Sequence, residues 1–284
     1  MKELPQKYAV IGWPVEHSVS PQMHNAAFKA CGINAEYERI PTPPERLSET
    51  VEKLRREGYS GWNATVPHKE NILPLLDNLD SKAELAGSVN TVIASEGQLI
   101  GFSTDGYGLE KALYEAFQTD IKDSSLVFIG AGGATRATAV HFAFQGVKRL
   151  TIINRTLEKA QKLCDLINSS VNHPVATPYP IDTPDEWQAD ILSADVIIQG
   201  TSMGLKLTDP LPLPEEMLEK DMCIYDMIYK KTPLLQKAKE KNCRIADGRG
   251  MLLHQGAGSF ELWTGRKAPV EEMRKTLDEL LKSA

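Results

Sequence analysis

Two charged residues at predicted strand ends, Lys69 and Asp105, are the side chains best suited to acid–base chemistry. Lys69 closes the segment NATVPHK (63–69), just after a short run typical of a strand, and Asp105 closes a second run that ends in STD (103–105). A lysine and an aspartate at two strand ends can meet across a cleft and pass a proton to and from a substrate oxygen. Each has an ordinary alternative, a solvated lysine and a helix cap. The pair therefore has chemical meaning only if the two side chains meet.

A glycine-rich segment, Gly130-Ala131-Gly132-Gly133-Ala134, begins 25 residues after Asp105. It follows the apolar run 126–129 and opens a predicted helix, which is the setting that a dinucleotide-binding loop requires. Glycines let the backbone approach a pyrophosphate, and the helix N-terminus supplies amide donors. Thr135 stands where the usual G-x-G-x-x-G pattern has its third glycine, so a tight structural turn is the alternative. The strand-to-helix context favours a cofactor loop.

The next predicted strand ends in Asn154-Arg155-Thr156, where an NAD-binding fold normally carries an acid that holds the ribose hydroxyls. An arginine can instead bind a 2′-phosphate through two parallel hydrogen bonds, and a threonine hydroxyl can add another. Lys159, one turn further, adds positive charge. Asn154 or Thr156 could also cap the following helix, which is compatible with binding phosphate. This segment therefore favours NADP over NAD.

Two serines, Ser18 and Ser20, follow the first predicted strand in the segment His17-Ser18-Val19-Ser20-Pro21. Two hydroxyls beside a helix N-terminus form a good receptor for a carboxylate. The alternative is that Ser20 is a plain N-cap with Pro21 at the first helical position. We expect His17 to be structural.

Three further segments could contribute to binding. Gln255 is a polar residue in the mostly apolar stretch 250–256, where it could point into a cleft or satisfy buried backbone. Met203, in Thr201-Ser202-Met203-Gly204, could pack on a flat ring, although core packing is the more frequent role of methionine. We predict that Thr201, Met203 and Gly250 contact the cofactor.

The 284-residue length favours two domains, and a composition of 42% hydrophobic and 25% charged residues is ordinary for a globular protein. A net charge of −6 argues against nucleic-acid binding. No apolar run approaches the ~18 residues of a membrane span. The cysteines and histidines show no metal-binding spacing, so no metal is expected, and the four cysteines fit a reducing cytoplasm.

The pattern of elements predicts an α/β fold with two α/β domains. Strands near 8–12, 35–40 and 61–66 alternate with helices from Ser20 to Gly32 and over 44–57, followed by a hairpin of 89–94 and 98–102. The second half alternates more regularly, with strands at 126–129, 149–153, 195–199, 222–227 and 243–246 and helices at 133–145 and 156–168. This rhythm predicts a mostly parallel sheet in the first domain and a Rossmann-like doubly wound sheet in the second. Helices over 106–118, 249–263 and 270–282 complete the prediction.

Taken together, these residues resemble the shikimate dehydrogenase family, NADP-dependent enzymes of aromatic amino-acid biosynthesis. Eight motifs in this order make the resemblance specific over nearly the whole chain: Ile11-Gly12-x-Pro14, His17-Ser18-x-Ser20-Pro21-x-Met23-His24-Asn25, Asn63-x-Thr65-Val66-Pro67-x-Lys69, Ala86-Gly87-x-Val89-Asn90-Thr91, Thr104-Asp105-Gly106, Gly130-Ala131-Gly132-Gly133-Ala134, Asn154-Arg155-Thr156 and Gln255-Gly256. The family usually has asparagine at the positions of Ser103 and Gln199. Its segment after Tyr229 is usually longer.

The resemblance implies a role for each matching residue. Ser18 and Ser20 would bind the carboxylate of shikimate or 3-dehydroshikimate, Lys69 and Asp105 would form the acid–base pair, and Tyr229 would line the same cleft. The ring hydroxyls would be bound by Thr65, Asn90, Asp105 and Gln255. The resemblance also implies NADP(H) as cofactor and a cytoplasmic monomer or homodimer.

We expect residues 1–104, completed by the C-terminal helices 249–284, to form the substrate domain, and 105–248 to form the NADP domain. The helix 249–263 would return Gln255 to the substrate side, and the active site would lie between the domains. Two alternatives stay open. A quinate/shikimate dehydrogenase that uses NAD would carry an acid near the ribose, against which Asn154-Arg155-Thr156 argues. A non-catalytic NADP-binding regulator is disfavoured by the intact Lys69 and Asp105.

Overall fold

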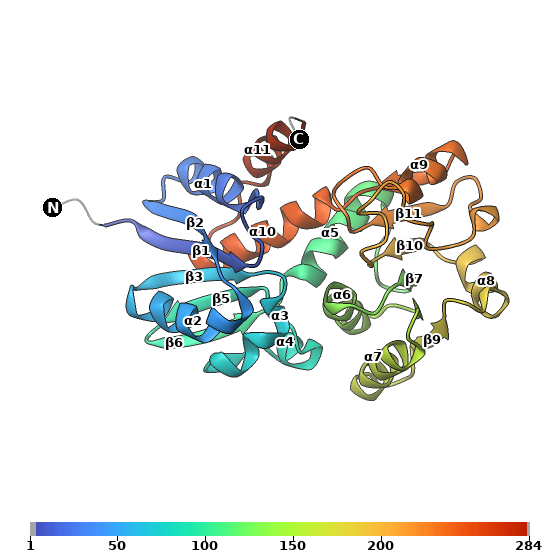
Figure 1. The fold of residues 1–284 in the computed structure, drawn as a ribbon, viewed down its shortest axis with the longest axis horizontal. Coiled ribbons are helices and arrows are strands. Elements are labelled where there is room, and N and C mark those ends of the chain that lie inside the picture. The colour runs from blue at the N-terminus through green and yellow to red at the C-terminus, as the bar shows by residue number, and fades with distance from the viewer. Residues whose placement is uncertain (1–3, 283–284) are drawn as a thin grey trace. The chain divides into compact units, whose positions relative to one another are not determined.

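The computed structural model describes residues 4–282, which form two compact units (Figure 1). The first unit runs to Gly108 and resumes at Leu253, and the second comprises Leu109–Leu252. Both divisions fall inside helices, α5 (Asp105–Phe117) and α10 (Arg249–Thr264), a few residues away from the predicted boundaries. Each helix therefore contributes residues to both units.

The first unit is built on a six-stranded sheet with the order β2-β1-β3-β5-β6-β4. Neighbours β2, β1 and β3 are parallel, β5 runs antiparallel to both β3 and β6, and β4 is parallel to β6. The strands are β1 (Gln6–Gly12), β2 (Ala35–Pro41), β3 (Tyr59–Ala64), β4 (Asn78–Leu79), β5 (Thr91–Ser95) and β6 (Gln98–Phe102). Its helices, besides the ends of α5 and α10, are α1 (Ser20–Ala30), α2 (Leu47–Arg56), α3 (His68–Asn71), α4 (Ser81–Ala86) and α11 (Val270–Lys282), with 3₁₀ turns at Pro44–Arg46 and Leu73–Leu75.

Local sequence explains the elements of this unit well. Helix α2 buries Leu47, Val51 and Leu54, which share one face at spacings of four and three residues. The β5–β6 hairpin turns at Glu96 and Gly97, both with positive φ, the conformation that a tight two-residue hairpin needs. Helix α11 packs on α1, so the C-terminus completes the first unit (Figure 1).

The second unit contains six parallel strands in the order β12-β11-β10-β7-β8-β9. This is the strand order of a doubly wound dinucleotide-binding sheet. The first three strands are added toward one side of the sheet, and the fourth is added on the other side of the first. The strands are β7 (Ser125–Ile129), β8 (Arg149–Asn154), β9 (Ala176–Pro180), β10 (Val196–Gln199), β11 (Cys223–Asp226) and β12 (Arg244–Ala246). The helices are α6 (Gly133–Phe144), α7 (Leu157–Ser170), α8 (Pro184–Leu192) and α9 (Pro233–Glu240), with a 3₁₀ turn at Glu215–Met217. The predicted fold class is confirmed.

Three local predictions need correction. Ser20 is the first residue of α1, not its N-cap, which is Val19, and Ser20 makes no capping bond with its side chain. Lys69 lies in the single-turn helix α3 that follows the strand, not directly at the strand end. Strand β9 and helix α8 were not predicted, because two prolines interrupt the strand pattern and only Trp187 and Ile191 of α8 are buried. Strand β9 lies at the edge of its sheet, and edge strands tolerate prolines.

Each unit has its own apolar core. Trp62, Ile11 and Leu54 lie in the first core, and Trp187, Ile197 and Ile224 lie in the second. No helix within residues 4–282 is both long enough and apolar enough to cross a membrane. All four cysteines are free thiols.

Candidate active site and cofactor pocket

The sheet of the first unit brings the predicted acid–base residues to one edge. Strands β3 and β6 both run antiparallel to β5, so their carboxyl ends lie at the same edge. Asn90 connects them there, because its carbonyl accepts a bond from the Ala64 amide and its own amide donates to the Phe102 carbonyl. The segments after these strands carry Lys69 and Asp105. Residues 36 positions apart in the chain thus begin from adjacent points of the sheet.

The side chains of Lys69 and Asp105 meet. The Lys69 Nζ donates to Asp105 Oδ2 at 2.5 Å, and the two side chains are 21% and 4% exposed. Asp105 is the first residue of α5, where the helix dipole favours a negative charge. The lysine is the more accessible partner, so it can reach a ligand while the carboxylate holds it in place. The two side chains thus contact each other, which was the condition for giving the pair a chemical role.

Asn90 fixes the other oxygen of the aspartate. Its Nδ2 donates to Asp105 Oδ1 at 3.1 Å and to Gln255 Oε1 at 3.1 Å, while its Oδ1 accepts the Thr104 amide at 2.8 Å. Gln255 comes from α10, so this helix does bring the side chain to the cluster around Lys69. The predicted residues Lys69, Asn90, Asp105 and Gln255 form one connected group.

A network of further buried polar side chains was not predicted from the sequence. Asn63 Nδ2 donates to Ser259 Oγ at 3.0 Å and to Thr91 Oγ1 at 3.1 Å, and the two hydroxyls lie 2.8 Å apart. The Tyr37 hydroxyl donates to Asn63 Oδ1 at 2.7 Å. Buried polar groups must be satisfied by partners, and a satisfied network holds a unique geometry. Ser259 lies four residues after Gln255 on α10, a spacing that could have signalled a shared helix face.

The two predicted carboxylate-binding serines follow β1: Ser18 lies in the loop after the strand, and Ser20 is the first residue of α1. This loop is bonded to the one after β3, since the Trp13 amide donates to the Val66 carbonyl at 3.0 Å. Ser18 Oγ accepts the Ser20 amide at 3.3 Å, and Arg39 donates twice to the Ser18 carbonyl. Ser20 is 8% exposed, and Ser18 is half-buried. The structure thus braces Ser18 through its backbone and leaves its hydroxyl hydrogen available.

Gly12 sets how closely the two loops approach. A Cβ at this position would lie 2.4 Å from Thr65 Cγ2 and 3.2 Å from the Val66 carbonyl oxygen. No larger residue fits without moving the loop that precedes Lys69. Thr65 is half-buried, and its amide donates to the Ile11 carbonyl at 2.9 Å. Its role toward a ligand stays a prediction.

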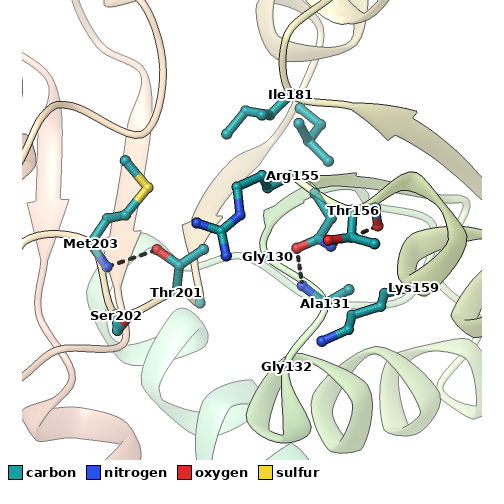
Figure 2. A pocket seen from close by; sticks show the side chains of 13 residues that line it. Gly130, Ala131, Gly132, Arg155, Thr156, Lys159, Ile181, Thr201, Ser202 and Met203 are labelled. Atoms are coloured by element: carbon teal, nitrogen blue, oxygen red, sulfur yellow. Dashed lines mark hydrogen bonds between the residues drawn. The ribbon is translucent and has the colours of Figure 1, made fainter.

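A pocket of about 310 Å³ lies at the carboxyl edge of the second sheet (Figure 2). That volume is at the lower end of the range for small-molecule sites. The glycine loop, the end of β8 and the loop after β10 form its walls, at the point where the strand order reverses. Its lining comprises Gly130, Ala131, Gly132, Ile153, Asn154, Arg155, Thr156, Lys159, Ile181, Gly200, Thr201, Ser202 and Met203.

The glycine loop has the conformation that the sequence implied. Gly130 has φ +108°, and a Cβ there would lie 2.6 Å from Thr201 Cγ2, so both backbone angle and space require glycine. Thr135 stands at the third glycine position and is fully buried. It fits because Gly200 faces it, where an added Cβ would lie 2.4 Å from Thr135 Oγ1. The missing third glycine is thus compensated by the glycine that follows the neighbouring strand β10.

Asn154 joins the glycine loop to the end of β8. Its Oδ1 accepts the Ala131 amide at 3.2 Å, and its Nδ2 donates to the Thr156 carbonyl at 2.8 Å. Arg155 and Lys159 are both exposed, and both line the pocket. Neither forms an ion pair with an acid within residues 4–282. Two cations beside a glycine loop fit a dinucleotide that carries an additional phosphate.

Some cofactor predictions fall outside this lining. Gly133 and Ala134 begin α6 rather than line the pocket, and Gly250 faces α5, where its added Cβ would lie 3.0 Å from Ala112 Cβ. Their contacts with a cofactor stay predictions. Ile181 lines the pocket but was missed, because it follows the unpredicted strand β9. Tyr229 belongs to the loop after β11 of the second unit and is 37% exposed, and its substrate role also stays a prediction.

Within the described residues, no group of three or more histidine, cysteine, aspartate or glutamate side chains could hold a metal ion. The doubly wound sheet, its glycine loop and the two cations define a dinucleotide-binding α/β protein. The lysine–aspartate pair adds the residues of an acid–base catalyst.

Comparisons with known proteins agree with this class. Three family models match the chain. They describe the shikimate dehydrogenase substrate-binding domain (residues 10–92), shikimate/quinate 5-dehydrogenase (residues 112–221) and the shikimate 5′-dehydrogenase C-terminal domain (residues 248–277). The chain is 40% identical over 277 residues to the NADP⁺-dependent shikimate dehydrogenase of Methanopyrus kandleri, covering 96% of this chain and 95% of that protein. The chain belongs to the shikimate dehydrogenase family.

Two solved structures show how far the likeness extends. The shikimate 5-dehydrogenase of Thermus thermophilus, in complex with NADP(H) and shikimate, has a TM-score of 0.82 and 34% identity, covering 97% of this chain and 99% of that one. The quinate dehydrogenase of Corynebacterium glutamicum, in complex with NAD, has a TM-score of 0.87 and 30% identity, covering 98% and 100%. The fold alone therefore does not separate the two activities.

Proposed function

We propose that this protein catalyses the reversible NADPH-dependent reduction of 3-dehydroshikimate to shikimate, a step of the shikimate pathway toward chorismate and the aromatic amino acids. The observation that carries this assignment is the 2.5 Å contact between Lys69 Nζ and Asp105 Oδ2, in a cluster with Asn90 and Gln255. Family membership supports the reaction type, and the cluster supplies the residues that it needs.

The chemistry requires a hydride at the ketone carbon and a proton at the ketone oxygen. When bound, NADPH supplies the hydride. Lys69 is the general acid that donates the proton to the developing alkoxide, and it takes the proton back in the reverse direction. Asp105 orients the ammonium group through their hydrogen bond. Asn90 holds the carboxylate, and Asn90 and Gln255 offer polar atoms to ring hydroxyls.

The cofactor assignment rests on the second unit. Arg155, Thr156 and Lys159 line the pocket and would hold the ribose 2′-phosphate of NADP, and no acid lines the pocket to hold free ribose hydroxyls. The backbone of the glycine loop and the N-terminus of α6 would receive the pyrophosphate. Ser18 and Ser20 are proposed to receive the substrate carboxylate.

Purified protein should oxidise NADPH when 3-dehydroshikimate is added, measured as loss of NADPH absorbance. Shikimate with NADP⁺ should run the reaction backwards. Quinate with NAD⁺ or NADP⁺ is the parallel assay, and faster turnover there would make the protein a quinate dehydrogenase. Binding of NADP⁺ without turnover of any of these substrates would make it a regulator. A cytoplasmic location and a monomeric or homodimeric state stay predictions.

A further inference from the structure

Two polar side chains of the second unit are completely buried at the carboxyl ends of neighbouring strands. Gln199 ends β10 and Asp226 ends β11, the two residues pair directly in the parallel register, and each is 0% exposed. Burying a polar group is costly unless its hydrogen bonds are satisfied. None of the chemistry described above uses either residue, so their burial calls for another explanation.

Gln199 holds the loop that follows its own strand. Its Oε1 accepts the Thr201 amide at 2.6 Å, and its Nε2 donates to the Met203 carbonyl at 2.7 Å. Thr201, Ser202 and Met203 all line the nucleotide pocket, and none of them is buried (Figure 2). A loop without buried apolar anchors depends on hydrogen bonds for its shape. The Gln199 amide therefore spans the turn and bonds both of its ends.

Asp226 holds the next loop in the same way. Its Oδ1 accepts the Ile228 amide at 3.0 Å, and its Oδ2 accepts the Thr232 hydroxyl at 2.8 Å. The Thr232 Oγ1 in turn accepts the Leu235 amide at 3.2 Å, which ties the loop to the first turn of α9. Tyr229 lies between the two bonded ends.

The two loops also contact each other. The Met227 amide donates to the Gln199 carbonyl at 2.9 Å, and a Cβ on Gly204 would lie 3.1 Å from Thr232 Cβ. Burial raises the pKa of the Asp226 carboxyl to about 6, with a smaller contribution from the charge of Asp247. The folded state thus keeps a carboxylate where burial disfavours its charge, which fits a positioning role.

We propose that Gln199 is a positioning residue for the cofactor: its side chain shapes the loop 200–203, which lines the nucleotide pocket. Asp226, through Thr232, shapes the neighbouring loop 227–232, which does not line that pocket and therefore serves as a comparison. The inference rests on the proposed function, because it takes NADPH as the ligand of the loop 200–203. A general loss of stability would follow from substitutions in either loop alike.

Gln199→Leu removes every side-chain hydrogen bond from this residue to the loop at nearly constant size. The dissociation constant of NADPH, measured by fluorescence, should rise about tenfold, the effect of losing one or two hydrogen bonds. The KM for shikimate should stay within about twofold. If Gln199→Leu does not fold, Gln199→Glu is the second variant, since it replaces the donor that faces the Met203 carbonyl with an acceptor. Gln188→Leu, on the exposed face of α8, is the matched control.

Thr232→Val removes the hydroxyl that bonds Asp226 while keeping the β-branched shape, and Thr232→Ser keeps the hydroxyl. Thr232→Val and Thr232→Ser should both leave the dissociation constant of NADPH unchanged, because the loop 227–232 does not line the nucleotide pocket. An equal rise of that constant in Gln199→Leu and Thr232→Val, together with a lowered melting temperature, would overturn the proposal, as would an unchanged constant in Gln199→Leu.

Failure of the proposed function has a different signature. A wild-type protein that does not turn over 3-dehydroshikimate or shikimate would overturn the function. The fluorescence titration of NADPH with Gln199→Leu would still test this inference.

Discussion

The two sites of this protein reach their geometry by opposite means. In the first unit, the Asp105 carboxylate is 4% exposed and each of its oxygens has a named side-chain partner. In the second unit, a glycine loop forms one wall of the nucleotide pocket, and the two cations that line it are exposed. A proton-transfer group must be held within tenths of an ångström, whereas a phosphate site needs accessible charge and room for the ligand. Substitutions should therefore act on rate in one unit and on affinity in the other.

The largest effect should follow from Lys69→Ala, which removes the proton donor. We expect kcat to fall by ~10²- to 10⁴-fold, the usual contribution of a positioned acid–base group, with almost unchanged NADPH affinity. Steady-state kinetics with 3-dehydroshikimate and a fluorescence titration of NADPH measure the two quantities. Asp105→Asn should also be slow and should weaken substrate binding. A near-normal kcat with only a raised KM would make Lys69 a binding residue.

Arg155→Ala tests the nucleotide pocket, the second of the two sites compared. Loss of a charge-assisted bond to the 2′-phosphate, worth roughly 1.5–3 kcal/mol, should weaken NADP binding ~10- to 100-fold and affect NAD much less. The dissociation constants of the two cofactors, measured in parallel, give the answer. Equal weakening with both would mean that Arg155 does not contact the 2′-phosphate.

Gly200→Ala tests the packing that supports the pocket. The added Cβ would lie 2.4 Å from Thr135 Oγ1, and overpacking of this kind costs about 1–3 kcal/mol. Urea denaturation should show a lower free energy of unfolding. The double substitution Gly200→Ala with Thr135→Gly, which restores the space, serves as the control. If that double variant were no more stable than Gly200→Ala alone, the contact would not be the cause.

His24 should make the first unit sensitive to acid. Its ring stacks on Tyr37 with centroids 4.5 Å apart, and neither ring nitrogen has a hydrogen-bond partner in the described part of the chain. Burial lowers the pKa of His24 from 6.5 to about 3. Because the folded pKa lies below the unfolded one, this stability is complete above about pH 6.5 and is lost as the pH falls toward 3. The slope approaches ~1.4 kcal/mol per pH unit.

Denaturation curves between these two pH values measure that slope. His24→Phe keeps a planar ring and has no proton to bind, so its stability should depend less on pH. His173→Gln, which replaces an exposed histidine, should leave the slope unchanged. A slope that is the same in wild type and His24→Phe would mean that another group controls the acid transition.

Short-range patterns were sufficient to predict much of this molecule. The glycine loop, the α2 face of Leu47, Val51 and Leu54, and the Glu96-Gly97 turn depend on neighbouring residues, so periodicity and backbone preference identify them. The same holds for the parallel βα rhythm of the second unit. Errors arose where these signals were weak or ambiguous, as at Ser20, where the start of a helix shifted by one residue, and at β9, where prolines obscured a strand.

Only the tertiary structure decided which polar residues meet. Asn63 and Ser259 are 196 positions apart, and their contact depends on α10 returning to the first sheet. The contact of Lys69 with Asp105 likewise depends on β3 and β6 ending at one edge, which strand pairing determines. The accommodation of Thr135 by Gly200 depends on adjacent strands of the second sheet. The sequence determined which groups are available for chemistry, and the pairing of distant segments decided their partners, because hydrogen bonds act only over about 3 Å.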